Sequence, residues 1–399
     1  MKNFWCITLF AFATAGAIAG DWPQFRGPNG SGVANEKDLP QTWSNTENVR
    51  WKAKVPGRSV ASPVVAAGRV YVASASGVNS TRLHVVCFDA KDGKELWHRE
   101  LAATGNTGCH PKSSMAAPTP VANANGVYVL FATADMAAFD KDGNLKWYRS
   151  LTGDYPKIAN QVGMASSPIL LNDTLIVPMD SDGESFLAGV DANYGTNIWK
   201  TERPKDINWV TPAIRKVGDK TELLFQGRGG MTAYDPGNGK KLWNYVVEGG
   251  TIPTPVIMDD SILMMARALE CIKVKDNQPV NVWTSPKLNS GSCTPVVLGD
   301  HIYNVSGAGV LVCGDKKGQE IWQERLKKGK YWASPIAGDG KVFVFNDEGI
   351  CTVVQAGGET ATVLATNDIK EEIMGTPAIA DGAIYIQTVT GIYCIAKKK

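Results

Sequence analysis

The segment SPVVAAGRVYVASASGVNSTRLHVVCFDAKDGKELW, residues 62–97, decides the fold of this chain. A Ser-Pro pair opens a short apolar strand, and Ala67-Gly68 turns the chain into an alternating strand around Val70–Val72. A third strand ends at Asp89, and a glycine turn leads to a strand that carries Trp97. The segment therefore predicts four short β-strands joined by tight turns within about 40 residues.

The Ser/Thr-Pro pair recurs along the whole chain. Its eight positions are Ser62-Pro63, Thr119-Pro120, Ser167-Pro168, Thr211-Pro212, Thr254-Pro255, Thr294-Pro295, Ser334-Pro335 and Thr376-Pro377. A repeat of about 40–50 residues with four strands in each unit is typical of a β-propeller. We therefore expect an all-β, eight-bladed propeller of four-stranded antiparallel blades.

A tryptophan closes nearly every repeat, in the pattern Asp-x3-Gly-x3-Trp or one residue shorter. The repeat tryptophans are Trp51, Trp97, Trp147, Trp199, Trp243, Trp283 and Trp322, and Leu364 takes the eighth position. Because their spacing follows the repeat, we interpret them as structural side chains that cover the junctions between blades, not as stacking surfaces for a ligand.

The phase of the repeat predicts how the ring closes. A tryptophan strand at Val49–Val55 precedes the first complete blade, and the last unit, Pro377–Ala396, supplies only three strands. The N-terminal strand should therefore complete the last blade and leave no open sheet edge. The expected organisation is a signal peptide at 1–19, an N-terminal extension at 20–48, one propeller domain at 49–396 and a basic tail at 397–399.

The first residues have the features of an export signal. Lys2 precedes an apolar run, Phe4–Ala19, that is too short to span a membrane, and Ala17-Ile18-Ala19 fits a cleavage site near Ala19/Gly20. We expect a periplasmic or secreted monomer without a transmembrane segment, and without a lipid anchor because no cysteine follows the cleavage site. A net charge of +2 gives no reason to expect a nucleic-acid partner.

Seven cysteines remain after removal of Cys6, so at least one is unpaired within the chain. Five lie late in their repeats and are interpreted as small buried hydrophobic residues: Cys87, Cys271, Cys313, Cys351 and Cys394. Cys109 and Cys293 lie near loops, and the sequence does not decide whether either of them forms a disulfide.

Two repeats carry a recognisable docking motif. Residues 87–97, CFDAKDGKELW, and 233–243, AYDPGNGKKLW, resemble the pyrroloquinoline-quinone-type propeller repeat. The opening residues Asp21–Gly30, DWPQFRGPNG, are similar to the start of a group of exported bacterial propellers. That group resembles the propeller subunit of the outer-membrane protein assembly machine.

The resemblance implies two different functions. Quinoprotein alcohol dehydrogenases bind the quinone on the propeller axis above a disulfide between adjacent cysteines, with Ca²⁺ and a catalytic Asp, whereas the assembly subunit is a non-catalytic scaffold. This chain has no Cys-Cys pair and no Cys-x-x-Cys-His haem motif. We therefore expect no cofactor. Pyrroloquinoline quinone with Ca²⁺ belongs to the alternative interpretation, which stays open because sugar-oxidising quinoproteins also lack the Cys pair.

Candidate binding residues lie in loops that should converge at one end of the axis. The candidates are Arg58, His110, Lys112, Gln161, Trp209, Arg228, Arg267, Tyr331 and Trp332, and their neighbours in these loops are Asn208, Lys330, Glu372, Asp135, Asp180, Asp182, Asp347 and Glu348. Mixed charge with aromatic side chains favours a binding surface. Ordinary solvated loops are the alternative.

Catalytic and metal-binding patterns are weak. His110 lies in the longest insertion, Gly105–Met115, where it could serve as a base or as a ligand. Ser113 or Ser114 could act as a nucleophile only if the fold supplied a histidine and an acid beside it. With four histidines in the chain, a multi-histidine metal site is not expected. Asp180–Glu184 resembles part of a Ca²⁺ loop but lacks its later ligands, which favours a solvated acidic turn.

The sequence therefore predicts an exported non-catalytic scaffold that engages protein or cell-envelope partners through its funnel face, with outer-membrane protein assembly as one such role. A quinone-dependent oxidoreductase is the alternative. A carbohydrate-binding or carbohydrate-processing propeller that uses Trp209, Tyr331 and Trp332 is a second alternative.

Overall fold

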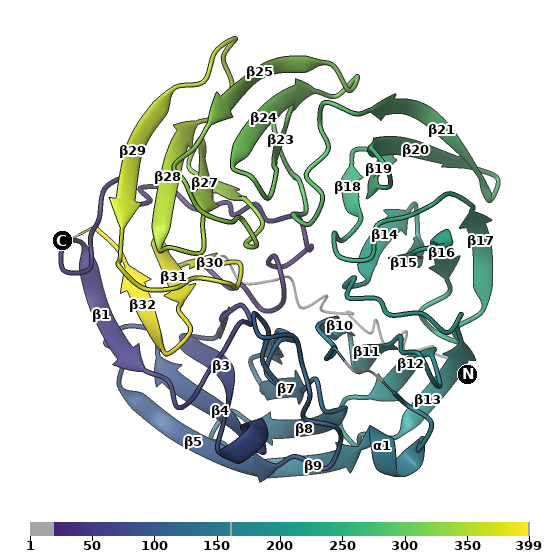
Figure 1. Cartoon of the computed structure of the whole chain (residues 1–399). Helices are drawn as coiled ribbons and strands as arrows, with labels where there is room; N and C mark the ends of the chain where they lie inside the picture. The colour runs from purple at the N-terminus through teal and green to yellow at the C-terminus, as the bar shows by residue number, and fades with distance from the viewer. Residues whose placement is uncertain (1–19, 160–161, 398–399) are drawn as a thin grey trace, which may run out of the picture.

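A computed structural model describes residues 20–159 and 162–397. Eight four-stranded antiparallel sheets stand as blades around a common axis (Figure 1). The expected eight-bladed propeller is confirmed. The proposed signal peptide at 1–19, the candidate Gln161 and the last two lysines of the basic tail lie outside the described residues.

We number the blades I to VIII along the chain, each from its innermost strand outward. The first four are β2 (Val64–Ala66), β3 (Arg69–Ser76), β4 (Arg82–Asp89) and β5 (Glu95–Ala102); β6 (Val121–Asn123), β7 (Gly126–Leu130), β8 (Asp135–Asp140) and β9 (Leu145–Ser150); β10 (Ile169–Leu171), β11 (Thr174–Met179), β12 (Phe186–Asp191) and β13 (Asn197–Glu202); and β14 (Ala213–Val217), β15 (Lys220–Gly227), β16 (Gly230–Tyr234) and β17 (Lys241–Tyr245).

Blades V to VIII follow the same order. They are β18 (Val256–Met258), β19 (Ser261–Met265), β20 (Leu269–Lys275) and β21 (Gln278–Ser285); β22 (Val296–Leu298), β23 (His301–Val305), β24 (Val310–Asp315) and β25 (Glu320–Arg325); β26 (Ile336–Gly338), β27 (Lys341–Phe345), β28 (Ile350–Gln355) and β29 (Val363–Asp368); and β30 (Ala378–Ala380), β31 (Ala383–Gln387), β32 (Gly391–Ile395) and β1 (Val49–Lys54). A 3₁₀ turn, Val78–Ser80, and a short helix, α1 (Leu151–Asp154), lie in connections.

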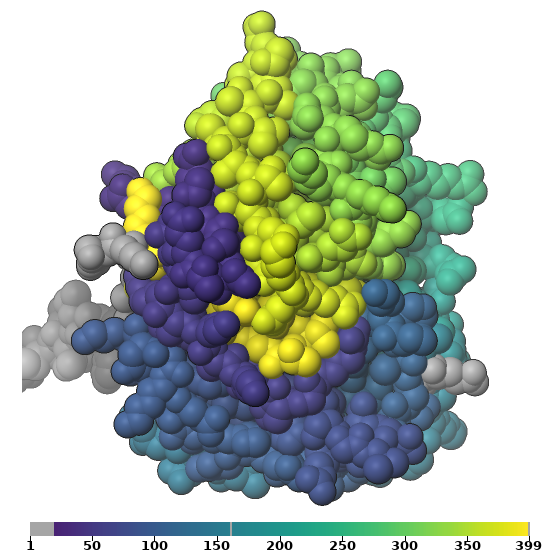
Figure 2. Space-filling view, turned by 60° about the vertical axis from the view of Figure 1, so that its left-hand side comes forward, coloured from purple at the N-terminus to yellow at the C-terminus, as the bar shows by residue number. Residues whose placement is uncertain are grey.

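The chain closes the ring as the repeat phase predicts. Strand β1 pairs antiparallel with β32, and Trp51 lies opposite Cys394. Figure 2 shows the purple N-terminal segment against the yellow C-terminal blade. Strand β1 therefore completes the four strands of the last blade, and the ring is closed by the two distant parts of the chain.

The repeat tryptophans cover the junctions between blades. In five blades the indole Nε1 donates to a backbone carbonyl of the following blade, at 2.9–3.0 Å: Trp51 to Ala90, Trp97 to Lys141, Trp147 to Ala192, Trp199 to Pro236 and Trp283 to Lys316. The ring lies over the turn glycine of that blade. A Cβ at Gly195, for example, would stand 2.7 Å from the Trp147 ring.

Strand register also explains the periodic cysteines. Each tryptophan lies opposite a small residue of the neighbouring strand, which leaves room for the indole, and four of these residues are Cys87, Cys271, Cys313 and Cys394. Cys351 is buried at a different register position, opposite Asn367. All seven cysteines of the described chain are free thiols, so the structure contains no disulfide at Cys109 or Cys293.

The prediction that Leu364 takes the eighth tryptophan position is wrong by one residue. Strand pairing places Ala365 there, opposite Val353, because the register shifts by one between Val353 and Val354. Trp43 of the N-terminal extension fills the space instead. Its ring lies 6.3 Å from Phe343, which occupies the row position that Tyr71 holds beside Trp97 in blade I.

The Ser/Thr-Pro pairs form a ring of hydroxyl groups around the axis, which we call the hydroxyl ring. Its members are Ser62, Thr119, Ser167, Thr211, Thr254, Thr294, Ser334 and Thr376. Six of them donate their backbone N–H to the hydroxyl oxygen of the next blade's member, at 2.9–3.1 Å. The periodicity of this pair therefore reflects the contacts that hold the innermost strands together.

The N-terminal extension crosses the propeller before it reaches β1. It pairs with blade I at Trp22 and Val65, passes the axis at Phe25 and Arg26, and pairs with blade VII at Val33 and Ala337. Within the described ranges no helix is long and apolar enough to cross a membrane.

Candidate functional site

The funnel face is the end of the axis where the inter-blade loops lie together with the loops that join second and third strands. Lys112 links two of its acidic residues, with Nζ 3.2 Å from Glu372 and 3.9 Å from Asp347. Arg58 lies 3.6 Å from the same Glu372. Loops from blades I, II, VII and VIII thus form one charged, partly exposed cluster, and the structure brings Arg58 and Lys112 together as expected.

His110 is exposed at the funnel face, where it organises its own loop. Its Nδ1 accepts a hydrogen bond from the backbone of Lys112 at 3.1 Å. Ser114 donates its hydroxyl to the carbonyl of Arg58 at 2.9 Å. No hydrogen bond between His110 and a serine hydroxyl is found in the described chain, so the serine-nucleophile hypothesis gains no support here.

Four funnel candidates lie inside the protein, which corrects their placement on the surface. Asp135 is fully buried and accepts from Thr104, Thr133 and Tyr148 hydroxyl groups. Asp180 forms a buried ion pair with Arg203 at 2.7 Å, and Asn208 donates to the same carboxylate.

Tyr331 is the fourth of these candidates. It is 2% exposed and donates its hydroxyl to the carbonyl of Lys327, which leaves no free stacking face. The polar and aromatic residues of these loops suggested exposed side chains. In the structure the side chains of Asp135, Asp180, Asn208 and Tyr331 are instead buried. The carbohydrate hypothesis therefore loses one of its three aromatic surfaces.

The remaining basic candidates stand on the rim. Arg228 pairs with Asp206 at 2.9 Å and Arg267 with Glu248 at 2.8 Å, and both arginines are largely exposed. Arg228 borders a recess of about 400 Å³ beside blade IV. These two arginines lie in different blades from the Lys112 cluster.

The acidic turn Asp180–Glu184 does not form a cation cage. The carboxylate of Asp180 forms an ion pair with Arg203, and the carboxylate of Glu184 forms an ion pair with Lys200. No cluster of three or more metal-ligating side chains exists in the described part of the chain. The prediction of a solvated acidic turn is therefore correct for Asp182, which is exposed, and wrong for Asp180, which is buried against Arg203.

Two tryptophans of the funnel lie at the mouth of the axis. Trp332 is 42% exposed, whereas Trp209 is partly buried and donates its Nε1 to the carbonyl of Gly163 at 2.9 Å. They border an axial cavity of about 130 Å³, whose walls include seven members of the hydroxyl ring. Phe25 of the N-terminal extension also lines this cavity.

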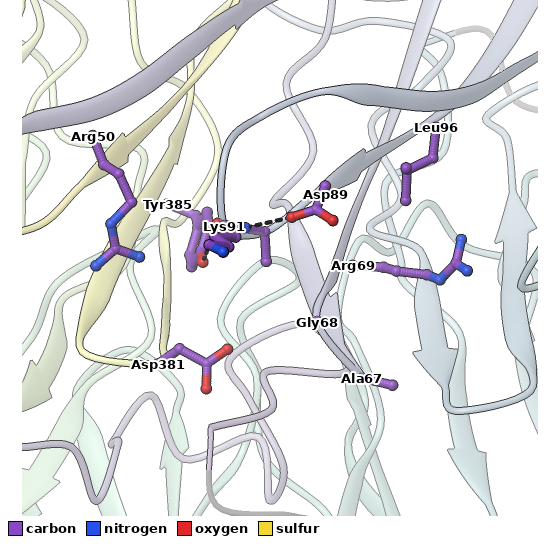
Figure 3. A pocket seen from close by; sticks show the side chains of 10 residues that line it. Arg50, Ala67, Gly68, Arg69, Asp89, Lys91, Leu96, Asp381 and Tyr385 are labelled. Carbon is purple, nitrogen blue, oxygen red and sulfur yellow. Dashed lines mark hydrogen bonds between the residues drawn. The ribbon is translucent and has the colours of Figure 1, made fainter.

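Sequence reasoning did not single out a recess of about 580 Å³ between blades VIII and I. It lies at the turns opposite the funnel face, and Figure 3 shows Arg50, Lys91 and Arg69 around it with Asp89 and Asp381. Arg69 already donates to the carbonyl of Lys141, and Asp89 accepts from the backbone of Lys91. The spacing of the repeats could not reveal this recess, because its lining residues are as distant in sequence as Arg50 and Asp381.

The fold is shared with solved structures at low sequence identity. BamB from Moraxella catarrhalis superposes with a TM-score of 0.65 and 15% identity, over 87% of this chain and 97% of that one. A europium-containing methanol dehydrogenase gives a TM-score of 0.70 at 12% identity, over 94% of this chain and 91% of that one.

A quinohemoprotein alcohol dehydrogenase from Comamonas testosteroni gives a TM-score of 0.71 at 13% identity, over 96% of this chain and 82% of that one. At such identities these similarities establish the fold and leave the activity open. A search of curated protein sequences finds no match to this chain.

A family profile gives the more specific result. The profile described as outer membrane protein assembly factor BamB matches three overlapping stretches, residues 33–162, 157–324 and 307–398. Together they include all eight blades and part of the extension. The chain therefore belongs to this family of BamB-type, PQQ-like repeat propellers.

Proposed function

We propose that this protein is an exported, non-catalytic scaffold that binds protein or cell-envelope partners through its funnel face, in the assembly of outer-membrane proteins. The observation that carries the proposal is the family profile over the whole propeller. Structural similarity to a BamB over 97% of that chain is in keeping with it, because the two propellers have nearly the same extent.

The funnel face has features of a protein-binding surface. The Lys112 cluster presents both signs of charge from four blades, and Trp332 stands exposed nearby. Binding energy in interfaces concentrates on such aromatic anchors, and surrounding charges set specificity and association rate. Within the described residues, His110 and the loop serines lack the mutual hydrogen bonds expected of a catalytic group.

Affinity capture from a cell-envelope extract tests the proposal. We expect the mature protein to retain a discrete protein partner, and the double variant Trp332→Ala with Lys112→Glu to lose it. Tyr194→Ala is the matched control, because Tyr194 is exposed in the Asp191–Gly195 turn at the opposite end of the blades. Equal capture by the protein and the double variant would place the binding surface elsewhere and overturn the proposal.

Quinone-dependent oxidation is the second candidate, because the two dehydrogenases superpose with higher TM-scores than the BamB structure. We expect no tight binding of pyrroloquinoline quinone and no oxidation of an alcohol or aldose, because the chain lacks the adjacent cysteines of the resembling enzymes. Titration with quinone and Ca²⁺, followed by absorbance and dye reduction, checks this. Micromolar binding with turnover would favour the enzyme.

A further inference from the structure

Arg26 is a fully buried charge on the propeller axis. Its guanidinium donates to the carbonyl oxygens of Gly30, Ser31, Thr294, Pro295 and Pro335. No carboxylate forms an ion pair with it among the residues that the structure describes. Burial lowers the pKa of Arg26 to about 9, so the side chain keeps its positive charge at neutral pH.

The hydroxyl ring beside Arg26 has hydrogen-bond donors to spare. A Ser or Thr hydroxyl carries one donor and two acceptor positions. Six ring hydroxyls accept one backbone N–H, yet no described acceptor receives a hydrogen bond from any ring hydroxyl. Ser62 Oγ and Thr254 Oγ1 are buried without any partner. They belong to blades I and V, which stand opposite each other in an eight-bladed ring.

The axial cavity combines these donors with an apolar mouth. Seven ring residues line it, Ser62 among them. Around the mouth, two residues before each ring position, stand Val60, Trp209, Ile252, Trp332 and Met374. Among the described residues, no charged side chain lines the cavity. Arg26 is connected to the cavity wall by the hydrogen bonds that its guanidinium donates to the carbonyl oxygens of Thr294 and Pro295.

We propose that the axial cavity binds a carboxylate carried on a compact apolar body. The carboxylate oxygens accept from the seven ring hydroxyls that line the cavity, of which Ser62 is the one without any partner, and the positive charge of Arg26 favours an anion over a cation there. The apolar body lies between Trp209 and Trp332. The cavity has a volume of about 130 Å³, so only a small acid can enter it.

Two sources share this chemistry: a free apolar acid and the C-terminal carboxylate of an apolar polypeptide. The first source goes beyond the scaffold role. The second rests on the proposed function, since it makes the cavity an anchor for the end of a partner chain.

Calorimetric titration with 3-phenylpropionate, together with tryptophan fluorescence, tests the proposal on the mature protein. We expect saturable one-to-one binding, with the neutral 3-phenylpropanamide at least ~10-fold weaker because it has lost the charge. Absence of any signal up to ~1 mM ligand, or equal affinity for acid and amide, would overturn the proposal.

Variants locate the binding to the cavity. Ser62→Ala removes a hydroxyl that lines the cavity and holds no hydrogen bond in the ring, so the fold should persist while affinity falls by ~10-fold or more. Ser74→Ala is the matched control, because Ser74 Oγ is also buried and unpaired but does not line the cavity. Ala165→Trp, at the mouth, should block binding. Unchanged affinity in Ser62→Ala and in Ala165→Trp would overturn the assignment.

A further arm separates the two sources. A pentapeptide that ends in phenylalanine is compared as free acid and as C-terminal amide. Tighter binding of the free-acid peptide than of phenylpropionate identifies a chain terminus, and equal binding identifies a free acid. Failure of these titrations would leave the partner capture described above unaffected, so the two proposals fail separately.

Discussion

Each glycine beneath a docking tryptophan meets two constraints at one position. Gly195 has φ of 72°, which favours glycine, and it also lies against the Trp147 ring. Gly68 has nearly the same φ, 73°, but nothing within 4 Å of its would-be Cβ. The pair therefore separates the cost of backbone strain from the cost of lost space.

We expect Gly195→Ala to lower the free energy of unfolding by ~1–3 kcal/mol more than Gly68→Ala, the range found for overpacked sites. Both variants carry a similar backbone penalty, so chemical denaturation of the two measures the steric contribution of the tryptophan contact. Equal loss in both variants would contradict the interpretation that the indole requires the glycine.

His84 links stability to pH. Its Nε2 lies 2.7 Å from Ser76 Oγ and its Nδ1 3.0 Å from His98, with Glu100 and Arg82 close by. Burial, followed by repulsion from His98, lowers the pKa of His84 below its ordinary value of 6.5. The unfolded state then binds the proton more readily, so stability is present above pH ~6.5 and is lost as the pH falls below it.

We expect His84→Gln to flatten the decline in thermal midpoint below pH ~6.5. The exposed His110→Gln should keep the slope of the unmodified protein and serves as the control. An unchanged slope in His84→Gln would show that other groups produce the acid sensitivity.

At the scale of strands and blades, the fourth strand of seven blades carries a tryptophan that covers the junction with the next blade. Trp243 on β17 is 5% exposed, and its Nε1 donates to Glu222, which pairs with Arg215 in a buried contact. We expect Trp243→Ala to cost about 3–5 kcal/mol, as for other buried aromatic residues. Trp332→Ala should cost much less, because Trp332 is exposed. Thermal unfolding of both variants checks this, and an unaltered midpoint for Trp243→Ala would contradict the docking role.

The periodic parts of this fold could be predicted from the sequence, since spacing alone carries them. The Ser/Thr-Pro pairs and the repeat tryptophans predict blade number and ring closure because most blades use them in the same contact. Trp43 could not be assigned this way. It precedes the repeat in sequence, and its contact with Phe343 exists only once the ring has folded.

The candidate site was harder to predict for the same reason. Asp135 and Asp180 stand in loops, where a carboxylate normally faces water, yet partners distant in sequence bury them. Arg26 showed no pattern either, because its partners are backbone carbonyls near Thr294 and Pro335. Local spacing therefore predicts elements, and only the assembled ring defines which charges are buried.

For the whole molecule, the N-terminal segment supplies strand β1 to the last blade and also connects several blades through contacts of its extension. Deletion of residues 20–55 removes β1, the crossing at Arg26 and the Trp43 contact, so we expect no cooperative thermal transition. Deletion of 20–48 alone keeps β1 and should retain a transition at a lower midpoint. Circular dichroism during heating measures both, and an unchanged midpoint after the larger deletion would rule out this closure.

The pairing of β1 with β32 also dictates when the protein can finish folding. Val49 is synthesised long before its partner Ile395, which lies 346 positions later in the chain. Throughout synthesis the nascent chain carries a strand without its partner, and such exposed edges are prone to aggregation. The final step joins residues of very large sequence separation, which makes it slow. A permuted chain that begins at β2 and ends with β1 would make these two strands almost consecutively and should complete its ring faster.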